Sequence, residues 1–275
     1  MTDATRDSTT GTDSITGTAP APGTDSITGT APAPGTDSIT GTAPAPGTAP
    51  TTGTAPTTDP DFVRAARASY DAMADPYTER HPDGLGSRPL ERALLTAFAE
   101  EVRGHSRAPV GDLGSGPGYV TARLHELGVP VFGVDVSPRM VALAREAHPH
   151  LRFHVGTMTA LDLPEETLGG ITALYSIIHI PTERLTAVFR EFRRVLVPGG
   201  HVLLSFQFPG GETDTLLHLS ERFGKEISLS YYLRTPETVA AHLREAGLEL
   251  RARTVREPVE EEKYTRAYLM ARRPE

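Results

Sequence analysis

Residues 109–119, Pro-Val-Gly-Asp-Leu-Gly-Ser-Gly-Pro-Gly-Tyr, have the pattern of a buried strand that turns through glycines into a helix. Glycine suits such a turn because it adopts positive φ at little cost and lets another molecule approach the backbone closely. The helix that follows, expected at about 119–127, would direct its N-terminal N–H groups into the adjoining crevice. The stretch therefore predicts a ligand-binding loop at one edge of a sheet.

A carboxylate follows the next predicted strand. Val131-Phe132-Gly133-Val134 leads directly to Asp135. In doubly wound nucleotide-binding folds, an acidic residue in this place accepts hydrogen bonds from ribose hydroxyls. The glycine loop and Asp135 together predict a nucleoside site.

The spacing of the glycines narrows the choice of nucleoside. The dinucleotide fingerprint G-x-G-x-x-G/A needs a third small residue where the helix packs on the strand. Gly114 and Gly116 match the first two positions, but Tyr119 stands at the third, and its ring fails that packing requirement. A nicotinamide oxidoreductase is therefore the least favoured alternative.

The segment Asp-Leu-Gly-Ser-Gly-Pro-Gly at 112–118, followed by Asp135, resembles motif I of the class I S-adenosylmethionine-dependent methyltransferases. The resemblance is to the small-molecule enzymes with type 11 and type 25 methyltransferase domains. It implies that Asp112 reaches the amino group of the cofactor's methionine part. It also implies that Gly114, Gly116 and Asp135 bind the same cofactor.

The resemblance assigns further residues to S-adenosylmethionine. Met140 corresponds to a residue that packs near the adenine, although a plain core methionine is the alternative. Thr157 and Met158 would flank the adenine ring, with Thr157 standing where family members commonly carry Asp. Tyr175, at the carboxyl end of the predicted central strand, completes the expected cofactor site.

His179 is the candidate general base. It follows a near-continuous apolar segment, Ile171–Ile178, which is expected to be the central strand of a sheet buried on both faces. Ligands of open α/β sheets bind at the carboxyl ends of the strands, where His179 would lie. An imidazole with a reference pKa of about 6.5 can accept a proton near neutrality. A histidine bonded to loop backbone is the alternative.

Tyr77 is the second candidate on the substrate side. The segment Tyr-Asp-Ala-Met-Ala-Asp-Pro-Tyr at 70–77 resembles the entry segment of many small-molecule methyltransferases, which folds over the cofactor as a lid. That resemblance implies that Tyr77, and with it His81, face the reaction centre. Packing of Tyr70 and Tyr77 within a pair of N-terminal helices is the alternative.

Composition excludes several classes of function. The 275 residues include no cysteine and carry a formal net charge of −8. Disulfides and Cys-ligated metals are thereby excluded, and a reducing cytoplasm is the expected compartment. No metal site is expected, because an acidic ligand of the catechol-methylating type is missing around Tyr175 and Ser176. No apolar run approaches the roughly 18 residues of a membrane span, and no secretory leader is evident. No clustered basic face suggests nucleic acid.

The first 60 residues differ from the rest. Residues 11–46 hold three copies of Gly-Thr-Asp-Ser-Ile-Thr-Gly-Thr-Ala-Pro-Ala-Pro. Each copy has one Ile as its only large apolar residue, too little to offset the entropy of ordering. We expect a disordered tail over 1–60 and a cofactor-binding domain over 61–275.

The remaining sequence alternates strands and helices, which predicts an α/β, doubly wound, mostly parallel sheet. The resemblance implies a Rossmann-like sheet of seven strands in the order 3-2-1-4-5-7-6, with the last strand antiparallel. Residues 207–235 show no clear element and are expected to cover the substrate. The elements expected after the central strand are a helix at 182–197, a strand at 201–206, a helix at 235–246 and strands at 248–255 and 266–271.

Transfer of a methyl group from S-adenosylmethionine to an O, N or C nucleophile of a small molecule is the favoured function. The alternative is a protein of the same fold that has lost methyl transfer and serves as a cyclase or a binding module, because fold alone does not decide function. The acceptor and the oligomeric state are left open by the sequence.

Overall fold

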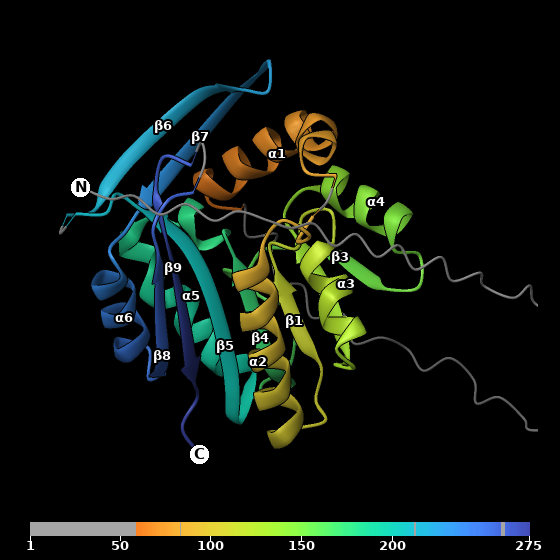
Figure 1. Cartoon of the computed structure of the whole chain (residues 1–275), viewed down its shortest axis with the longest axis vertical. Helices are drawn as coiled ribbons and strands as arrows, with labels where there is room; N and C mark the ends of the chain where they lie inside the picture. The colour runs from red at the N-terminus through yellow and green to blue at the C-terminus, as the bar shows by residue number, and fades with distance from the viewer. Residues whose placement is uncertain (1–58, 83, 212, 260–261) are drawn as a thin grey trace, which may run out of the picture. The chain divides into compact units, whose positions relative to one another are not determined.

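The computed structural model describes residues 59–82, 84–211, 213–259 and 262–275 (Figure 1). The expected tail lies outside these residues, apart from Asp59 and Pro60. Within the described ranges the chain forms six α-helices, one 3-10 helix and nine strands. All of the expected site residues fall in this part.

Seven of the strands form one sheet in the order β3-β2-β1-β4-β5-β9-β8. β9 is antiparallel to both β5 and β8, whereas the other pairings are parallel. The doubly wound, mostly parallel sheet and its strand order are confirmed. The strands are β1 (Val110–Leu113), β2 (Val131–Asp135), β3 (Arg152–Val155), β4 (Leu168–Leu174), β5 (Leu196–Phe208), β8 (Glu249–Arg256) and β9 (Thr265–Arg272).

Helices cover both faces of this sheet. α2 and α3 pack on one face around Phe98 and Leu124, and α5 and α6 pack on the other around Phe192 and Leu243. Figure 1 shows α2 in front of the sheet and α5 behind it. The helices are α1 (Asp61–Arg80), α2 (Pro89–His105), α3 (Tyr119–Glu126), α4 (Pro138–Ala147), α5 (Thr182–Val195) and α6 (Pro236–Glu245).

Local sequence explains where two of these helices begin. Ser137 caps α4, because its Oγ accepts a hydrogen bond from the Met140 N–H at 3.0 Å, and Pro138 follows as the first helical residue. α1 begins directly after Pro60, and Asp61 lies within its first turn. Its carboxylate there still complements the positive end of the helix dipole.

The glycine loop forms the predicted strand–turn–helix unit between β1 and α3. Gly114 has φ +78°, and a Cβ there would lie 2.4 Å from the Ser176 Cβ. Gly118, the residue before α3, has φ +91°, and a Cβ there would lie 2.8 Å from the Phe153 ring. Both positions therefore require glycine for backbone conformation and for close packing.

The central strand is shorter than the apolar segment suggested. β4 ends at Leu174, Tyr175 adopts φ +55°, and Ile177–His179 form the 3-10 helix η1. The isoleucines at 177 and 178 are still buried. An apolar run reports burial but does not distinguish a strand from a buried turn, so the predicted strand end was wrong.

Residues 207–235 contain an element that the sequence analysis missed. β6 (Thr215–Arg222) and β7 (Lys225–Leu233) form a separate antiparallel hairpin. Its turn is Phe223-Gly224, with φ of +53° and +69°. Alternate residues of β7 are buried, from Ile227 to Leu233. Figure 1 shows this hairpin beside α1, and Ser69 of α1 bonds the Ser228 backbone.

One prediction concerns the core. Phe192 is fully buried on the apolar face of α5. Phe192→Ala should lower the free energy of unfolding by about 3–5 kcal/mol, because it removes apolar burial and leaves a cavity. Urea denaturation followed by circular dichroism measures the change. Arg184→Ala, at an exposed position of the same helix, is the control and should stay within about 0.5 kcal/mol of the parent. Equal effects of the two substitutions would contradict the assigned packing.

Candidate functional site

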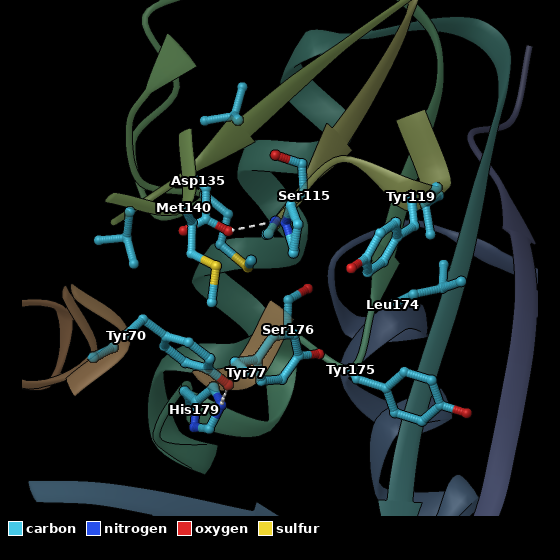
Figure 2. A pocket seen from close by; sticks show the side chains of 18 of the residues that line it. Tyr70, Tyr77, Ser115, Tyr119, Asp135, Met140, Leu174, Tyr175, Ser176 and His179 are labelled. Carbon is cyan, nitrogen blue, oxygen red and sulfur yellow. Dashed lines mark hydrogen bonds between the residues drawn. The ribbon is translucent and has the colours of Figure 1, made fainter. Parts of the chain in front are cut away.

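A cavity opens at the carboxyl ends of β1, β2 and β4, and α1 closes one side of it. We call it the glycine-loop cavity. It holds about 1140 Å³ of empty space, its open mouth included. Figure 2 shows Asp135 and Met140 on one side of it and Tyr70, Tyr77 and His179 on the other. All of the expected site residues except Asp112 and His81 line this cavity.

Asp135 and the glycine loop form its polar end. The Asp135 carboxylate accepts the Gly116 N–H at 2.8 Å and the Ser137 N–H at 2.9 Å, one on each oxygen. Burial raises the pKa of Asp135, and these two N–H groups oppose the shift by stabilising the ionised form. Each oxygen retains a second lone pair for a ligand hydroxyl.

Asp112 does not line the cavity. Its side chain is 1% exposed and lies under the loop, where it accepts the hydroxyl hydrogens of Thr121 at 2.6 Å and Thr172 at 2.8 Å. Burial raises the pKa of Asp112 to about 6. In this arrangement the carboxylate joins β1 to α3 and β4, and the structure does not bring it to the expected ligand contact.

Met140, Thr157 and Met158 line one wall of the cavity. Met140 is almost completely buried at the start of α4. The Thr157 hydroxyl bonds the Thr159 hydroxyl at 2.9 Å and its backbone N–H at 3.2 Å, which holds the turn after β3. The wall is therefore mostly apolar, and the Thr157 side chain is engaged within its own turn.

Tyr175 borders the cavity, but its ring points away from it, as Figure 2 shows. Its hydroxyl donates to the Glu91 carboxylate at 2.9 Å and lies 3.1 Å from the Tyr268 hydroxyl. Burial, followed by the charge of Glu91, raises the pKa of the Tyr175 phenol. The phenol hydroxyl is thus hydrogen-bonded outside the cavity, and only the remainder of Tyr175 borders the cavity.

His179 pairs with Tyr70 in the floor of the cavity. The Tyr70 hydroxyl lies 2.8 Å from His179 Nε2, and Nδ1 lies 2.9 Å from the Ser230 carbonyl oxygen. A carbonyl only accepts, so Nδ1 carries the proton and Nε2 accepts the Tyr70 O–H. Burial lowers the pKa of His179 to about 4. The ring is thus a neutral acceptor that orients Tyr70.

Tyr77 and Tyr231 each pack against one ring of this pair. Tyr77 lines the cavity and packs edge-on against Tyr70, with ring centroids 6.4 Å apart. The Tyr231 ring packs edge-on against His179 at 4.7 Å. His81 stacks on the far side of Tyr77 at 4.6 Å and does not line the glycine-loop cavity.

Sequence reasoning did not identify the residue that holds α1 in place. The Asp71 carboxylate accepts the Ser137 hydroxyl at 2.6 Å and the Arg139 N–H at 3.1 Å. Arg139 also pairs with Asp75, one turn further along α1. Tyr70 directly precedes Asp71 in the chain, so the hydrogen bonds of Asp71 also direct Tyr70 into the cavity. The adjacent Tyr-Asp pair in the 70–77 segment was the available signal.

Part of the chain is similar to known methyltransferase domains. The model of the Methyltransferase domain family matches residues 110–200. The demethylmenaquinone methyltransferase of Chlorobaculum parvum is 30% identical over 137 residues, which are 49% of this chain and 56% of that protein. The chain thus spans little more than half of that relative's length.

Two solved structures share the fold. Magnesium protoporphyrin IX methyltransferase of Synechocystis, solved with bound S-adenosylmethionine, has a TM-score of 0.57 and 16% identity over 79% of this chain and 99% of its own. The cyclase SpnF has a TM-score of 0.58 and 18% identity over 78% of this chain and 97% of its own.

Residues 110–200 are thus similar to the Methyltransferase domain family, and the chain has the fold of solved S-adenosylmethionine-dependent methyltransferases. The residues of the glycine-loop cavity fit the cofactor of that family. A Cβ added at Gly116 would meet no heavy atom within 4 Å, so the loop backbone faces open space that a ligand can fill. Asp135 presents a carboxylate to this space, and Met140 and Met158 form apolar parts of the lining. None of the helices in the described ranges is both long and apolar enough to cross a membrane.

Asp112 gives this methyltransferase domain a testable pH dependence. The folded pKa of about 6 exceeds the unfolded value of about 3.9, so the unfolded chain releases the proton first as the pH rises. The folded state therefore loses stability between these two values. The amide of Asp112→Asn does not titrate. Relative to the parent, the free energy of unfolding of this variant should therefore increase by about 1–3 kcal/mol between pH 4 and pH 7. Urea unfolding at both pH values measures this gain, and a pH-independent difference would contradict it.

A second prediction concerns the tautomer of His179. Its imidazole should stay neutral, with the proton on Nδ1, from pH 8 to about pH 5, because its pKa is lowered to about 4. Long-range ¹H–¹⁵N NMR of the histidine side chains reports both properties, and His179→Gln assigns the signals. A titration midpoint near 6.5 would show that the ring is not desolvated as described.

Proposed function

We propose that this protein transfers a methyl group from S-adenosylmethionine to an O, N or C nucleophile of a small molecule. The observation that supports it most is one cavity that combines two features. At one end the Asp135 carboxylate meets the glycine-loop backbone, and at the other end the Tyr70 hydroxyl is bonded to His179. A cofactor site and a proton-accepting pair thus face the same space.

The residues proposed to hold the cofactor are those of the polar end and the apolar wall. Asp135 would accept ribose hydroxyls, Gly116 would give backbone access, and Met140 and Met158 would enclose the adenine. S-adenosylmethionine, when bound, supplies a methyl group on a sulfonium, an electrophile that is already activated. The protein's part is then to orient the acceptor and to exclude water.

The Tyr70–His179 pair supports a role in removing the acceptor's proton. A proton from the acceptor can pass to the Tyr70 oxygen while the Tyr70 proton passes to His179 Nε2. The imidazolium that results keeps its Nδ1–H on the Ser230 carbonyl. Such proton transfer typically contributes about 10²–10⁴-fold to a rate.

The lowered pKa of His179 sets the timing of that step. A base with a pKa of about 4 does not ionise an alcohol or a phenol before reaction. It does accept a proton from an oxygen or nitrogen that has become acidic through forming a bond to the methyl carbon. We therefore propose that proton transfer accompanies or follows methyl transfer, with Tyr77 shielding the pair from solvent.

The same fold without methyl transfer is the second candidate. The likeness to the cyclase SpnF, at 18% identity, concerns fold alone and leaves this alternative to experiment. A cytoplasmic site of action is also part of our proposal, because the sequence contains no cysteine and fits a reducing compartment.

Calorimetric titration of the full chain tests the cofactor assignment. S-adenosylmethionine and S-adenosylhomocysteine should bind with micromolar dissociation constants, and NAD should bind much more weakly. Asp135→Ala should weaken S-adenosylhomocysteine about 10–100-fold or more, because charge-assisted hydrogen bonds to the ribose are lost.

The matched control is Asp162→Ala, which removes an exposed carboxylate outside the cavity and should leave binding unchanged. Tighter binding of NAD, or no binding of any of the three nucleotides, would overturn the methyltransferase proposal. Binding of S-adenosylmethionine without methyl transfer to any acceptor in a broad screen would favour the cyclase or binding-module alternative.

A further inference from the structure

A second cavity lies next to the first, beneath the β6–β7 hairpin. We call it the hairpin cavity. It has about 2230 Å³ of empty space, its open mouth included, and is bordered by the end of α1, the start of α2, the hairpin, and residues Val259 and 262–264 between β8 and β9. Arg88 lines both cavities, so the two adjoin at this side chain. The apolar part of the lining comes largely from the hairpin: Leu217, Leu219, Phe223, Tyr231 and Leu233.

The charges in this lining are mostly positive, although the chain as a whole has a net charge of −8. Among the described residues, the basic side chains outnumber the acidic ones. The basic residues are Arg80, Arg88, Arg222, Arg256, Lys263 and Arg266, and the acidic residues are Glu91 and Glu262. A concave surface of one sign concentrates ligands of the opposite sign.

Both acidic side chains are already engaged. Glu262 makes a two-point ion pair with Arg256, at 2.8 and 3.0 Å, and lies 3.4 Å from Arg266. Glu91 is buried and accepts hydrogen bonds from two tyrosine hydroxyls. The remaining basic groups are therefore not neutralised by these carboxylates.

Arg222 is the basic group of this lining that contacts Tyr231. Its guanidinium donates to the Tyr231 hydroxyl and lies over the Phe223 and Tyr231 rings, 5.0 and 5.8 Å from their centroids. Within the described part of the chain it forms no ion pair with a carboxylate. The Tyr231 ring in turn packs against His179. One aromatic side chain thus separates Arg222 from the Tyr70–His179 pair.

A buried amide adds a further unsatisfied group. Gln207, at the end of β5, lines the hairpin cavity, and its Oε1 is buried with no hydrogen-bond partner among the described residues. Buried polar groups are nearly always paired, so such an atom points to a ligand that completes the pairing. Since the amide also donates, it can bond either a hydroxyl or an oxyanion of that ligand.

We propose that the hairpin cavity binds an oxyanion, such as a carboxylate, at one end of the methyl acceptor. The acceptor would be a small molecule with an apolar body against the hairpin and its nucleophile directed toward the Tyr70–His179 pair. Arg222 is the principal ligand of the oxyanion, because a guanidinium with free N–H groups forms two parallel hydrogen bonds to such a group. This inference rests on the proposed function and specifies its substrate class.

The test compares two probes of nearly equal size and shape, the anionic 6-hydroxy-2-naphthoate and the neutral 6-hydroxy-2-naphthamide. Their binding to the full chain is measured by calorimetry in the presence of saturating S-adenosylhomocysteine. The naphthoate should bind at least about tenfold more tightly than the amide, because one charge-assisted hydrogen bond contributes about that much affinity. Arg222→Met should abolish that preference, and Arg222→Lys, which keeps the charge, should restore part of it.

Arg244→Met is the matched control, because Arg244 is exposed on α6 and lies outside both cavities. Arg222→Met should still bind S-adenosylhomocysteine like the parent, which shows that the variant is folded. Equal affinity for the two probes, binding of neither, or a preference that survives Arg222→Met would each overturn the oxyanion site. Loss of S-adenosylhomocysteine binding by the unmodified chain would instead overturn the proposed function.

Discussion

The hydrogen bond from the Gly116 N–H to the Asp135 carboxylate, at 2.8 Å, joins the two loops on which the site depends. It connects the segment after β1 to the last residue of β2, so the carboxyl ends of two neighbouring strands become one rigid edge. The cost of burying the Asp135 charge is reduced by this bond and by the Ser137 N–H on the other oxygen. A carboxylate fixed in this way is already oriented toward a ligand.

The opposite side of the cavity is built from segments far apart in the chain. Asp71 anchors α1 to the start of α4, and the adjacent Tyr70 then reaches His179, which lies beyond β4. His179 is in turn fixed by the Ser230 carbonyl of the β6–β7 hairpin. Helix, 3-10 turn and hairpin thus support one another around a single polar contact, and a displacement of any of them would separate Tyr70 from its acceptor.

Much of the sheet could be predicted because its signals are local. Strand–turn–helix boundaries follow from glycine and proline positions, and residue type alone accounts for the cap at Ser137 and the helix start at Pro138. The hairpin was missed because its turn, Phe223-Gly224, lacks the Asn or Asp that favours positive φ, although Ile227, Leu229 and Tyr231 alternate as a strand should. The end of β4 was missed because burial continues through the turn at Tyr175.

Asp112 and Asp135 show that the spacing of residues in the sequence does not by itself determine the chemical role of a side chain. Both follow apolar strand residues and both are buried, yet they have different partners. Asp112 precedes the glycine turn and is directed under it, where two threonine hydroxyls satisfy it. Asp135 ends its strand and meets backbone N–H groups that leave lone pairs open to the cavity. The position of each carboxylate relative to the end of its strand, rather than its residue type, therefore decides whether it stabilises the fold or faces a ligand.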